Sequence, residues 1–314
     1  MGTALIPCIL VSGYLGAGKT TLINQFLSAP DGLRAVVLVN DFGKVNIDAH
    51  LIDNKSENTI ELSNGCACCS IGDSLLAAAQ QAASRIPRPA VIIVEASGVA
   101  RPDRMATLLL GASGVAPAQI VTVVDMSQAR AALENKYISE LFSHQITVAQ
   151  CLAPNRMCPD NAQVLKRLSA PDGITPPHVT GLGQVVQGAV LPQTTARRSQ
   201  SATPLVQMQS DLDSAQFVRK LVSVPDGADI EQVHDWLANM PQHIHRAKGF
   251  AQLSDQHGRM ALYTLSKSRN VVRVQPSTAN IPKDVVGQVV VIAPRAAPGA
   301  QLCDWDVSFG GDGG

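Results

Sequence analysis

The residues that decide the fold are Gly13-Tyr14-Leu15-Gly16-Ala17-Gly18-Lys19-Thr20, which follow the pattern G-x-x-x-x-G-K-[ST]. An apolar run at residues 9–11 precedes this stretch, and a helix-like stretch at residues 20–27 follows it. Glycines let backbone N–H groups converge on phosphate oxygens, and the partial positive charge at the start of the next helix also attracts anions. The pattern therefore predicts a phosphate-binding loop for a nucleoside triphosphate.

The residue types of this loop match the tasks of phosphate binding. The Lys19 ammonium reaches the β- and γ-phosphates, and the Thr20 hydroxyl is a ligand for Mg²⁺. We therefore expect Lys19 to be catalytic and Mg²⁺ to be a cofactor. Nucleotide contacts are expected from Gly13, Gly16, Ala17, Gly18, Lys19, Thr20 and Thr21.

Short apolar runs alternate with helix-like stretches in the first half of the chain. The runs are residues 9–11, 35–39, 91–94 and 120–124, and the expected helices are residues 20–27, 74–83, 101–110 and 128–140. Runs of this kind are typical of parallel strands that are buried on both faces. The alternation predicts an α/β fold, a P-loop NTPase parallel sheet with flanking helices.

The second half of the chain has a different pattern. A polar region at residues 182–213 is interpreted as a linker or loop. Strand-like runs at residues 217–224, 249–253, 260–265, 271–274 and 285–292, with one helix near residues 230–240, then indicate a smaller α+β domain. We expect a nucleotide-binding domain at 1–181, a linker at 182–213, and a C-terminal domain with a flexible tail at 214–314.

Composition excludes several classes of protein. Of the 314 residues, 25 are Lys or Arg and 25 are Asp or Glu, so the formal charge is zero. A neutral chain is not expected to bind nucleic acid through bulk electrostatics. No window approaches the roughly 18 consecutive apolar residues of a membrane span, and the N-terminus lacks a secretory pattern. We therefore expect a cytoplasmic protein with no membrane partner.

Two acidic residues follow predicted strands. Glu95, in Glu95-Ala96-Ser97-Gly98, lies where ligands of open α/β sheets bind, and a carboxylate there holds Mg²⁺ or orients the attacking water. Gly98 would let a backbone N–H approach the γ-phosphate. Asp125 has a similar position, and for it a helix cap and a nucleotide contact are equal alternatives.

Three of the seven cysteines form a compact C-x-C-C motif, Cys66-Ala67-Cys68-Cys69. Three thiolates bind one soft metal ion but leave a tetrahedral shell incomplete, so a fourth ligand must come from elsewhere. An incomplete shell suits metal transfer, although redox-active thiols remain an alternative. His243 and His245 would share a strand face, and a solvated polar face is the favoured interpretation there. The other cysteines are expected to be small buried apolar residues.

Taken together, these motifs resemble the CobW-type GTPases, a P-loop family that includes metal chaperones and insertases. The resemblance also rests on Asn40-Asp41-Phe42-Gly43, at the family's N-E-F-G switch segment, and on Arg246-Ala247-Lys248-Gly249-Phe250. It covers about residues 5–275. It implies GTP as the nucleotide, a C-terminal domain after the GTPase domain, and control of metal binding or of partner docking by the nucleotide state.

The chain departs from the family pattern at two motifs. Where the family has N-K-x-D for guanine, this chain has Asn155, Arg156 and Cys158, so Asn155 is retained while the carboxylate acceptor is lost. Losing such a bond weakens guanine discrimination on the order of ten- to a hundredfold. In the switch segment, Asp41 retains an oxygen ligand, whereas Lys44 replaces a second carboxylate. Asp41 is therefore the fourth metal ligand that we expect.

The resulting expectation is a nucleotide-dependent metallochaperone that hydrolyses GTP slowly and transfers a metal to a client metalloprotein. Zn²⁺ is favoured by ligand softness, and Co²⁺ or Fe²⁺ is compatible with the same ligands. The alternatives are a nucleotide-binding regulator with little turnover and a scaffold that activates a metalloenzyme. P-loop relatives of this kind often dimerise, so a homodimer is compatible with the resemblance. The sequence does not identify the client.

Overall fold

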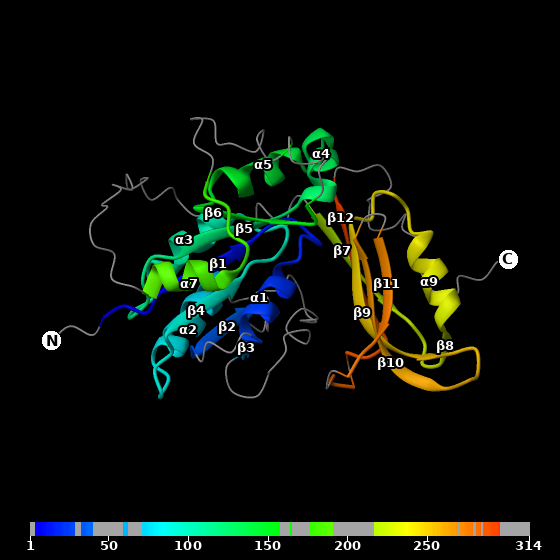
Figure 1. The fold of residues 1–314 in the computed structure, drawn as a ribbon. Helices are drawn as coiled ribbons and strands as arrows, with labels where there is room; N and C mark the ends of the chain where they lie inside the picture. The colour runs from blue at the N-terminus through cyan, green and yellow to red at the C-terminus, as the bar shows by residue number, and fades with distance from the viewer. Residues whose placement is uncertain are drawn as a thin grey trace. The chain divides into compact units, whose positions relative to one another are not determined.

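The computed structural model describes residues 4–28, 33–39, 59–61, 71–157, 164, 176–190, 217–268, 271–278, 281–283 and 285–295. The chain forms two compact units, and the second consists mainly of residues 213–314 (Figure 1). The expected linker residues 191–213, the switch segment and the C-x-C-C motif all lie outside the described residues.

The first unit contains a six-stranded sheet in the order β3-β2-β4-β1-β5-β6, in which every neighbouring pair is parallel. Every residue of the three central strands β2, β4 and β1 is buried, as expected for a sheet covered on both faces. The predicted α/β fold is confirmed. The strands are β1 (Cys8–Ser12), β2 (Ala35–Val39), β3 (Thr59–Glu61), β4 (Val91–Glu95), β5 (Gln119–Asp125) and β6 (Cys151–Asn155).

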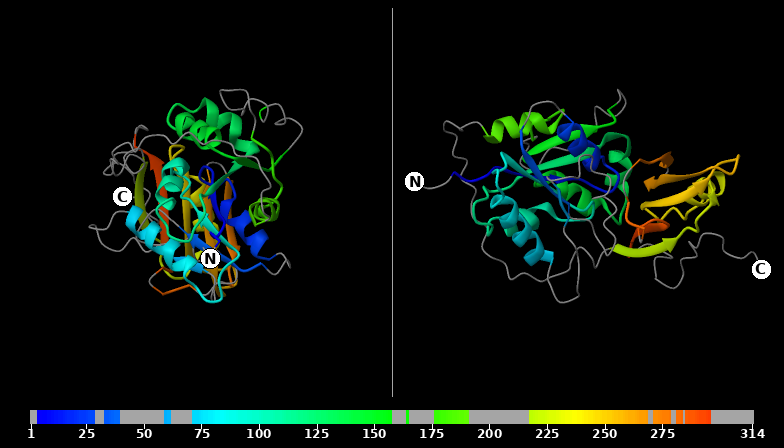
Figure 2. Two further views of the ribbon diagram at one scale, coloured as in Figure 1. Left: turned by 90° about the vertical axis from the view of Figure 1, so that its left-hand side faces the viewer. Right: turned by 90° about the horizontal axis from the view of Figure 1, so that it is seen from below.

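Helices cover both faces of this sheet (Figure 2). On one face, α1 (Lys19–Leu27) and α7 (Leu182–Val190) contact each other. On the other face, α2 (Ile71–Ala83) and α3 (Pro102–Leu109) pack with the strands around Leu10, Leu75 and Leu109, all fully buried. No helix in the described part of the chain is long and apolar enough to cross a membrane.

Two sequence expectations about helices are wrong. The single helix expected at residues 128–140 is two helices, α4 (Met126–Glu134) and α5 (Ser139–Thr147), because Asn135 ends α4 with an extended backbone (φ −84°, ψ 111°). The first nine residues of the expected linker form α7, because Leu182, Val185 and Val186 lie on one helical face and are buried. Where the linker begins and ends beyond Val190 stays a prediction.

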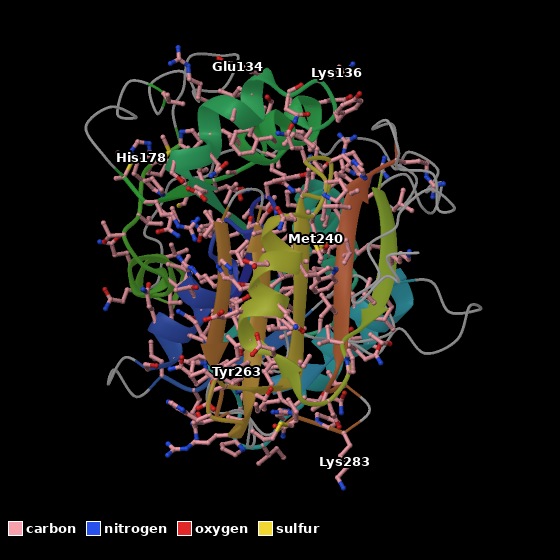
Figure 3. All side chains as sticks on the ribbon, turned by 90° about the vertical axis from the view of Figure 1, so that its right-hand side faces the viewer. Glu134, Lys136, His178, Met240, Tyr263 and Lys283 are labelled. Atoms are coloured by element: carbon pink, nitrogen blue, oxygen red, sulfur yellow. The ribbon has the colours of Figure 1, made fainter. Side chains whose placement is uncertain are left out.

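In its described residues, the second unit is an antiparallel sheet with one helix, as expected for an α+β domain. The order of the sheet is β11-β10-β9-β12-β7, and the short β8 (Ala228–Asp229) pairs with β9 in parallel. Helix α9 (Ile230–Ala238) lies in front of the sheet in Figure 3 and buries Val233 and Leu237 against it. The long strands are β7 (Phe217–Ser223), β9 (Arg246–Ser254), β10 (Met260–Ser268), β11 (Val271–Pro276) and β12 (Gln288–Pro294).

Candidate functional site

The glycine-rich loop connects β1 to α1 at the carboxyl edge of the parallel sheet. Two of its glycines have backbone conformations that other residues rarely adopt, with φ +133° at Gly13 and φ +104° at Gly18. A Cβ at Gly13 would lie 2.2 Å from the carbonyl oxygen of Val123, and one at Gly18 would lie 2.5 Å from Nδ2 of Asn155. The path of the loop therefore requires glycine at both positions.

Lys19 is the first residue of α1 and is only 4% exposed. Its ammonium donates hydrogen bonds to the loop carbonyls of Gly13, at 2.9 Å, and Tyr14, at 3.5 Å. Burial of a charged group requires such partners, and here they hold the positive charge inside the curve of the loop. The positive end of α1 lies at the same place, so the loop is built to attract an anion. Thr21, also predicted to contact nucleotide, is exposed on the first turn of α1.

Thr20 and Glu95 meet although they are 75 positions apart in the sequence. Strands β1 and β4 are neighbours with Val11 and Glu95 in register, so Glu95 lies beside the loop. The Thr20 hydroxyl donates to Oε1 of Glu95 at 2.8 Å, and Glu95 is 3% exposed. A hydroxyl and a carboxylate held together at the edge of the sheet are the hard oxygen donors that Mg²⁺ prefers, so the residues present fit this ion.

The backbone of Gly98 lies directly against the glycine-rich loop. A Cβ on Gly98 would lie 2.7 Å from the backbone nitrogen of Leu15 and 2.8 Å from its Cα. Only a residue without a side chain permits this contact. The structure thus brings the segment that follows β4 against the predicted phosphate-binding loop.

Asn155, at the end of β6, also reaches the loop. Its side-chain amide donates to the carbonyl of Ala17 at 3.0 Å, and Ala17 is buried. Arg156 adopts a left-handed conformation (φ 53°), donates to the carbonyl of Gly16 at 3.3 Å and forms an ion pair with Asp125. The end of β6 therefore supports two consecutive carbonyls of the loop. Cys158 lies outside the described residues.

Asp125 was compatible with either a helix cap or a nucleotide contact. Its Oδ1 accepts hydrogen bonds from the Ser127 backbone N–H at 3.1 Å and from the Ser127 hydroxyl at 2.6 Å, so it caps α4. Its Oδ2 faces Arg156. Both carboxylate oxygens therefore have protein partners, which favours the cap.

The expected metal ligands Cys66, Cys68, Cys69 and Asp41 lie outside the described residues, and so does Lys44. Within the described ranges, no group of three or more His, Cys, Asp or Glu side chains could hold a metal ion. His243 and His245 precede β9 and are not on a strand. His245 is 5% exposed, so the expected solvated face is wrong for this residue, whereas His243 is partly buried, which lowers its pKa.

Two of the scattered cysteines are buried, as the sequence predicts. Cys8 in β1 and Cys151 in β6 are free thiols. Burial raises the pKa of Cys8 to about 12 and also raises the pKa of Cys151. Their thiols therefore stay protonated and unreactive at neutral pH.

Sequence reasoning missed a buried side chain that connects the Gly98 segment to α5. Gln145 is fully buried, and its Nε2 donates to the carbonyls of Gly98, at 3.3 Å, and Ala100, at 2.9 Å. The sequence did carry one signal, because this amide lies on the same face of the helix as apolar residues that are buried. These are Leu141, Phe142 and Ile146.

Family models match most of the chain. The CobW/HypB/UreG nucleotide-binding domain matches residues 7–169, and the C-terminal domain of the cobalamin synthesis protein CobW matches residues 219–302. With its phosphate-binding loop on a parallel sheet, the chain therefore belongs to the CobW/HypB/UreG family of nucleotide-binding proteins.

Individual relatives match shorter segments. A zinc chaperone CobW from a Sinorhizobium species is 31% identical over 179 residues, which is 48% of this chain and 51% of that protein. A zinc-regulated GTPase metalloprotein activator 1 from Dictyostelium discoideum is 37% identical over 114 residues, 32% of this chain and 24% of that protein. The zinc chaperone YjiA from Escherichia coli K12 is 34% identical over 101 residues, 31% of this chain and 32% of that protein. The chain thus spans about half or less of the length of these relatives.

Proposed function

We propose that the chain is a nucleotide-dependent metallochaperone that hydrolyses GTP slowly and passes a divalent metal, zinc in the first place, to a client metalloprotein. The observation that carries this proposal is the contact between Thr20 and Glu95 beside the buried Lys19. It supports a nucleotide and magnesium site at the edge of the sheet, and a soft-metal motif follows β3 in the same domain.

The roles of the protein side chains in hydrolysis follow from this geometry. Lys19 brings a fixed positive charge to the phosphates and needs only to exchange two loop carbonyls for phosphate oxygens. Thr20 would be a ligand of Mg²⁺, and Glu95, which accepts its hydrogen bond, would position either Mg²⁺ or the attacking water. Mg²⁺, when bound, neutralises charge on the phosphates.

GTP is the proposed nucleotide because the chain belongs to a family with GTPase members and retains Asn155 against the loop. Cys158 stands where the resemblance places the aspartate that reads guanine. A thiol is a weak acceptor, so the preference for GTP over ATP should be on the order of ten- to a hundredfold weaker than a carboxylate provides.

The metal to be carried is assigned to Cys66, Cys68 and Cys69, with Asp41 as the fourth ligand. Three thiolates and one carboxylate suit Zn²⁺ and are compatible with Co²⁺ or Fe²⁺. Two of the relatives described above are named zinc chaperones, which supports zinc. Asp41 lies in the segment that corresponds to a nucleotide switch, and a ligand on a switch couples metal affinity to nucleotide state.

A second candidate is a nucleotide-binding regulator or metalloenzyme activator with little turnover. Cys158 favours it, because weak base recognition is more damaging to a selective GTPase than to a protein that only holds nucleotide. One relative is named a metalloprotein activator, which is compatible with a scaffold role.

Phosphate release by the wild type and the Lys19→Ala variant tests the nucleotide part of the proposal. We expect slow release from GTP with Mg²⁺, a loss on the order of tenfold to a hundredfold in Lys19→Ala, and no change in Lys283→Ala, which removes an exposed lysine of the second unit. Tight binding without release would favour the regulator. A wild type that binds no nucleotide would contradict both candidates.

A further inference from the structure

Two consecutive side chains of helix α5, His144 and Gln145, form hydrogen bonds with the chain segment that follows β4. Gln145 donates to the carbonyls of Gly98 and Ala100. His144 lies beside it, with Nε2 2.7 Å from Oδ1 of Asp103 in the first turn of α3. The whole segment from Gly98 to Asp103 is therefore attached to α5.

The position of Gln145 is fixed by its backbone as well as by its side chain. Its own backbone carbonyl accepts a 2.7 Å hydrogen bond from the buried hydroxyl of Thr122 in β5. Gln145 thus connects the Gly98 segment to strand β5 of the sheet. A fully buried side chain has few alternative rotamers, so it restrains the backbone that it contacts more tightly than an exposed side chain would.

The chemistry of Gln145 argues against simple packing. Among the described residues, its Oε1 is one of the buried side-chain atoms that have no hydrogen-bond partner. Burial of an unsatisfied amide oxygen is unfavourable, and an apolar side chain would fill this position without that penalty. The amide is accounted for by its two Nε2 contacts, which both act on the segment that follows Glu95.

The hydrogen bonds of Gln145 restrain Gly98, whose backbone is in contact with Leu15 of the phosphate-binding loop. A backbone N–H of the Gly98 segment is the group expected to meet a γ-phosphate and not a β-phosphate. Holding this segment against the loop in advance lowers the conformational cost of that contact. The same restraint has no bearing on a diphosphate, which lacks the γ-phosphate.

We propose that Gln145 is a positioning residue that sets the preference of this site for nucleoside triphosphate over diphosphate, by holding Gly98 against the phosphate-binding loop. The inference rests on the proposed nucleotide function. It assigns the discrimination of nucleotide state to a residue that contacts neither the nucleotide nor the metal.

The test compares dissociation constants for a non-hydrolysable GTP analogue and for GDP, each measured by competition with a fluorescent nucleotide. Gln145→Met keeps the length of the side chain and removes its donors. We expect the ratio of triphosphate to diphosphate affinity to fall about tenfold, which corresponds to about 1.4 kcal/mol. Gln145→Asn, whose amide is one methylene too short to reach both carbonyls, should behave in the same way and serves if the Met variant does not fold.

Thr147→Ala is the matched control, because it removes a hydrogen bond to the Ser143 carbonyl at the exposed side of the same helix and leaves Gln145 in place. A ratio that is unchanged in both Gln145 variants would overturn the proposal, and so would an equal change in Thr147→Ala. A wild type that binds neither nucleotide would instead contradict the proposed function itself, so the two failures are distinguishable.

Discussion

Substitution of Gly18 by alanine should weaken nucleotide binding strongly while leaving the sheet intact. Gly18 has φ +104°, where a side chain is strained by about 1–2 kcal/mol. Its new Cβ would lie 2.5 Å from Nδ2 of Asn155 and would displace the amide that donates to Ala17. Losing that hydrogen bond adds about 0.5–1.5 kcal/mol.

The two terms together disfavour the native loop by about 1.5–3.5 kcal/mol, and nucleotide binds only the native loop. Because the apparent dissociation constant rises in inverse proportion to the competent population, affinity should fall on the order of 10- to 400-fold. Calorimetric titration with GDP measures this, and circular dichroism checks that the secondary structure persists.

The matched control is Gly183→Ala in helix α7, where a Cβ would meet nothing within 4 Å. That change should leave nucleotide affinity unaltered and stabilise the helix by about 0.5–1 kcal/mol. If Gly18→Ala bound GDP within threefold of the wild type, the strained loop and its contact with Asn155 would not determine affinity, and the reasoning would be refuted.

Three further outcomes are expected. Thr20→Ala should reduce Mg²⁺-dependent hydrolysis on the order of ten- to a hundredfold, whereas Thr20→Ser, which keeps the hydroxyl, should retain it. Equal rates of phosphate release by the two variants would contradict a metal role for the hydroxyl. Burial would raise the pKa of Asp103, but the His144 hydrogen bond and the charges of His144 and Arg101 hold this pKa below its ordinary value of 3.8. Asp103→Asn should therefore be less stable than the wild type in urea unfolding at pH 7, and this difference in stability should disappear as the pH falls below 3.8 and then below the lowered pKa. A difference in stability that persisted at lower pH would argue against the ion pair. Burial raises the pKa of Cys8 to about 12, so iodoacetamide at pH 8 should alkylate Cys8 only after the protein has unfolded. Peptide mass mapping measures this labelling, and rapid labelling of Cys8 in the native protein would contradict its burial.

The sequence predicts the sheet well because each strand carries its own signal. The apolar runs in β1, β2 and β4 have no polar face, which matches a strand covered by helices on both sides. The strand–glycine loop–helix order then predicts where the phosphate site lies, and the rule that ligands bind at the carboxyl edge led to Glu95. These inferences need only local pattern and topology.

The contacts between distant segments could not be predicted in the same way. The local signal for the end of α4 is weak, because Asn135 is a residue type found at helix ends but neither glycine nor proline follows it closely. The ion pair of Asp125 with Arg156 and the amide contacts of Gln145 join residues about 30 to 50 positions apart, and side-chain contacts across such separations leave no periodicity in the sequence. The buried face of α7 did have the helical spacing, and the polar residues around it concealed the signal.

The most direct test of the account is a calorimetric titration of the metal-free protein with Zn²⁺, alone and with a non-hydrolysable GTP analogue, with an ATP analogue for comparison. The account predicts near-stoichiometric zinc binding whose affinity changes at least tenfold when the GTP analogue is present, a coupling of about 1.4 kcal/mol or more. Zinc affinity that is the same with and without nucleotide would contradict the claim that the nucleotide controls the metal.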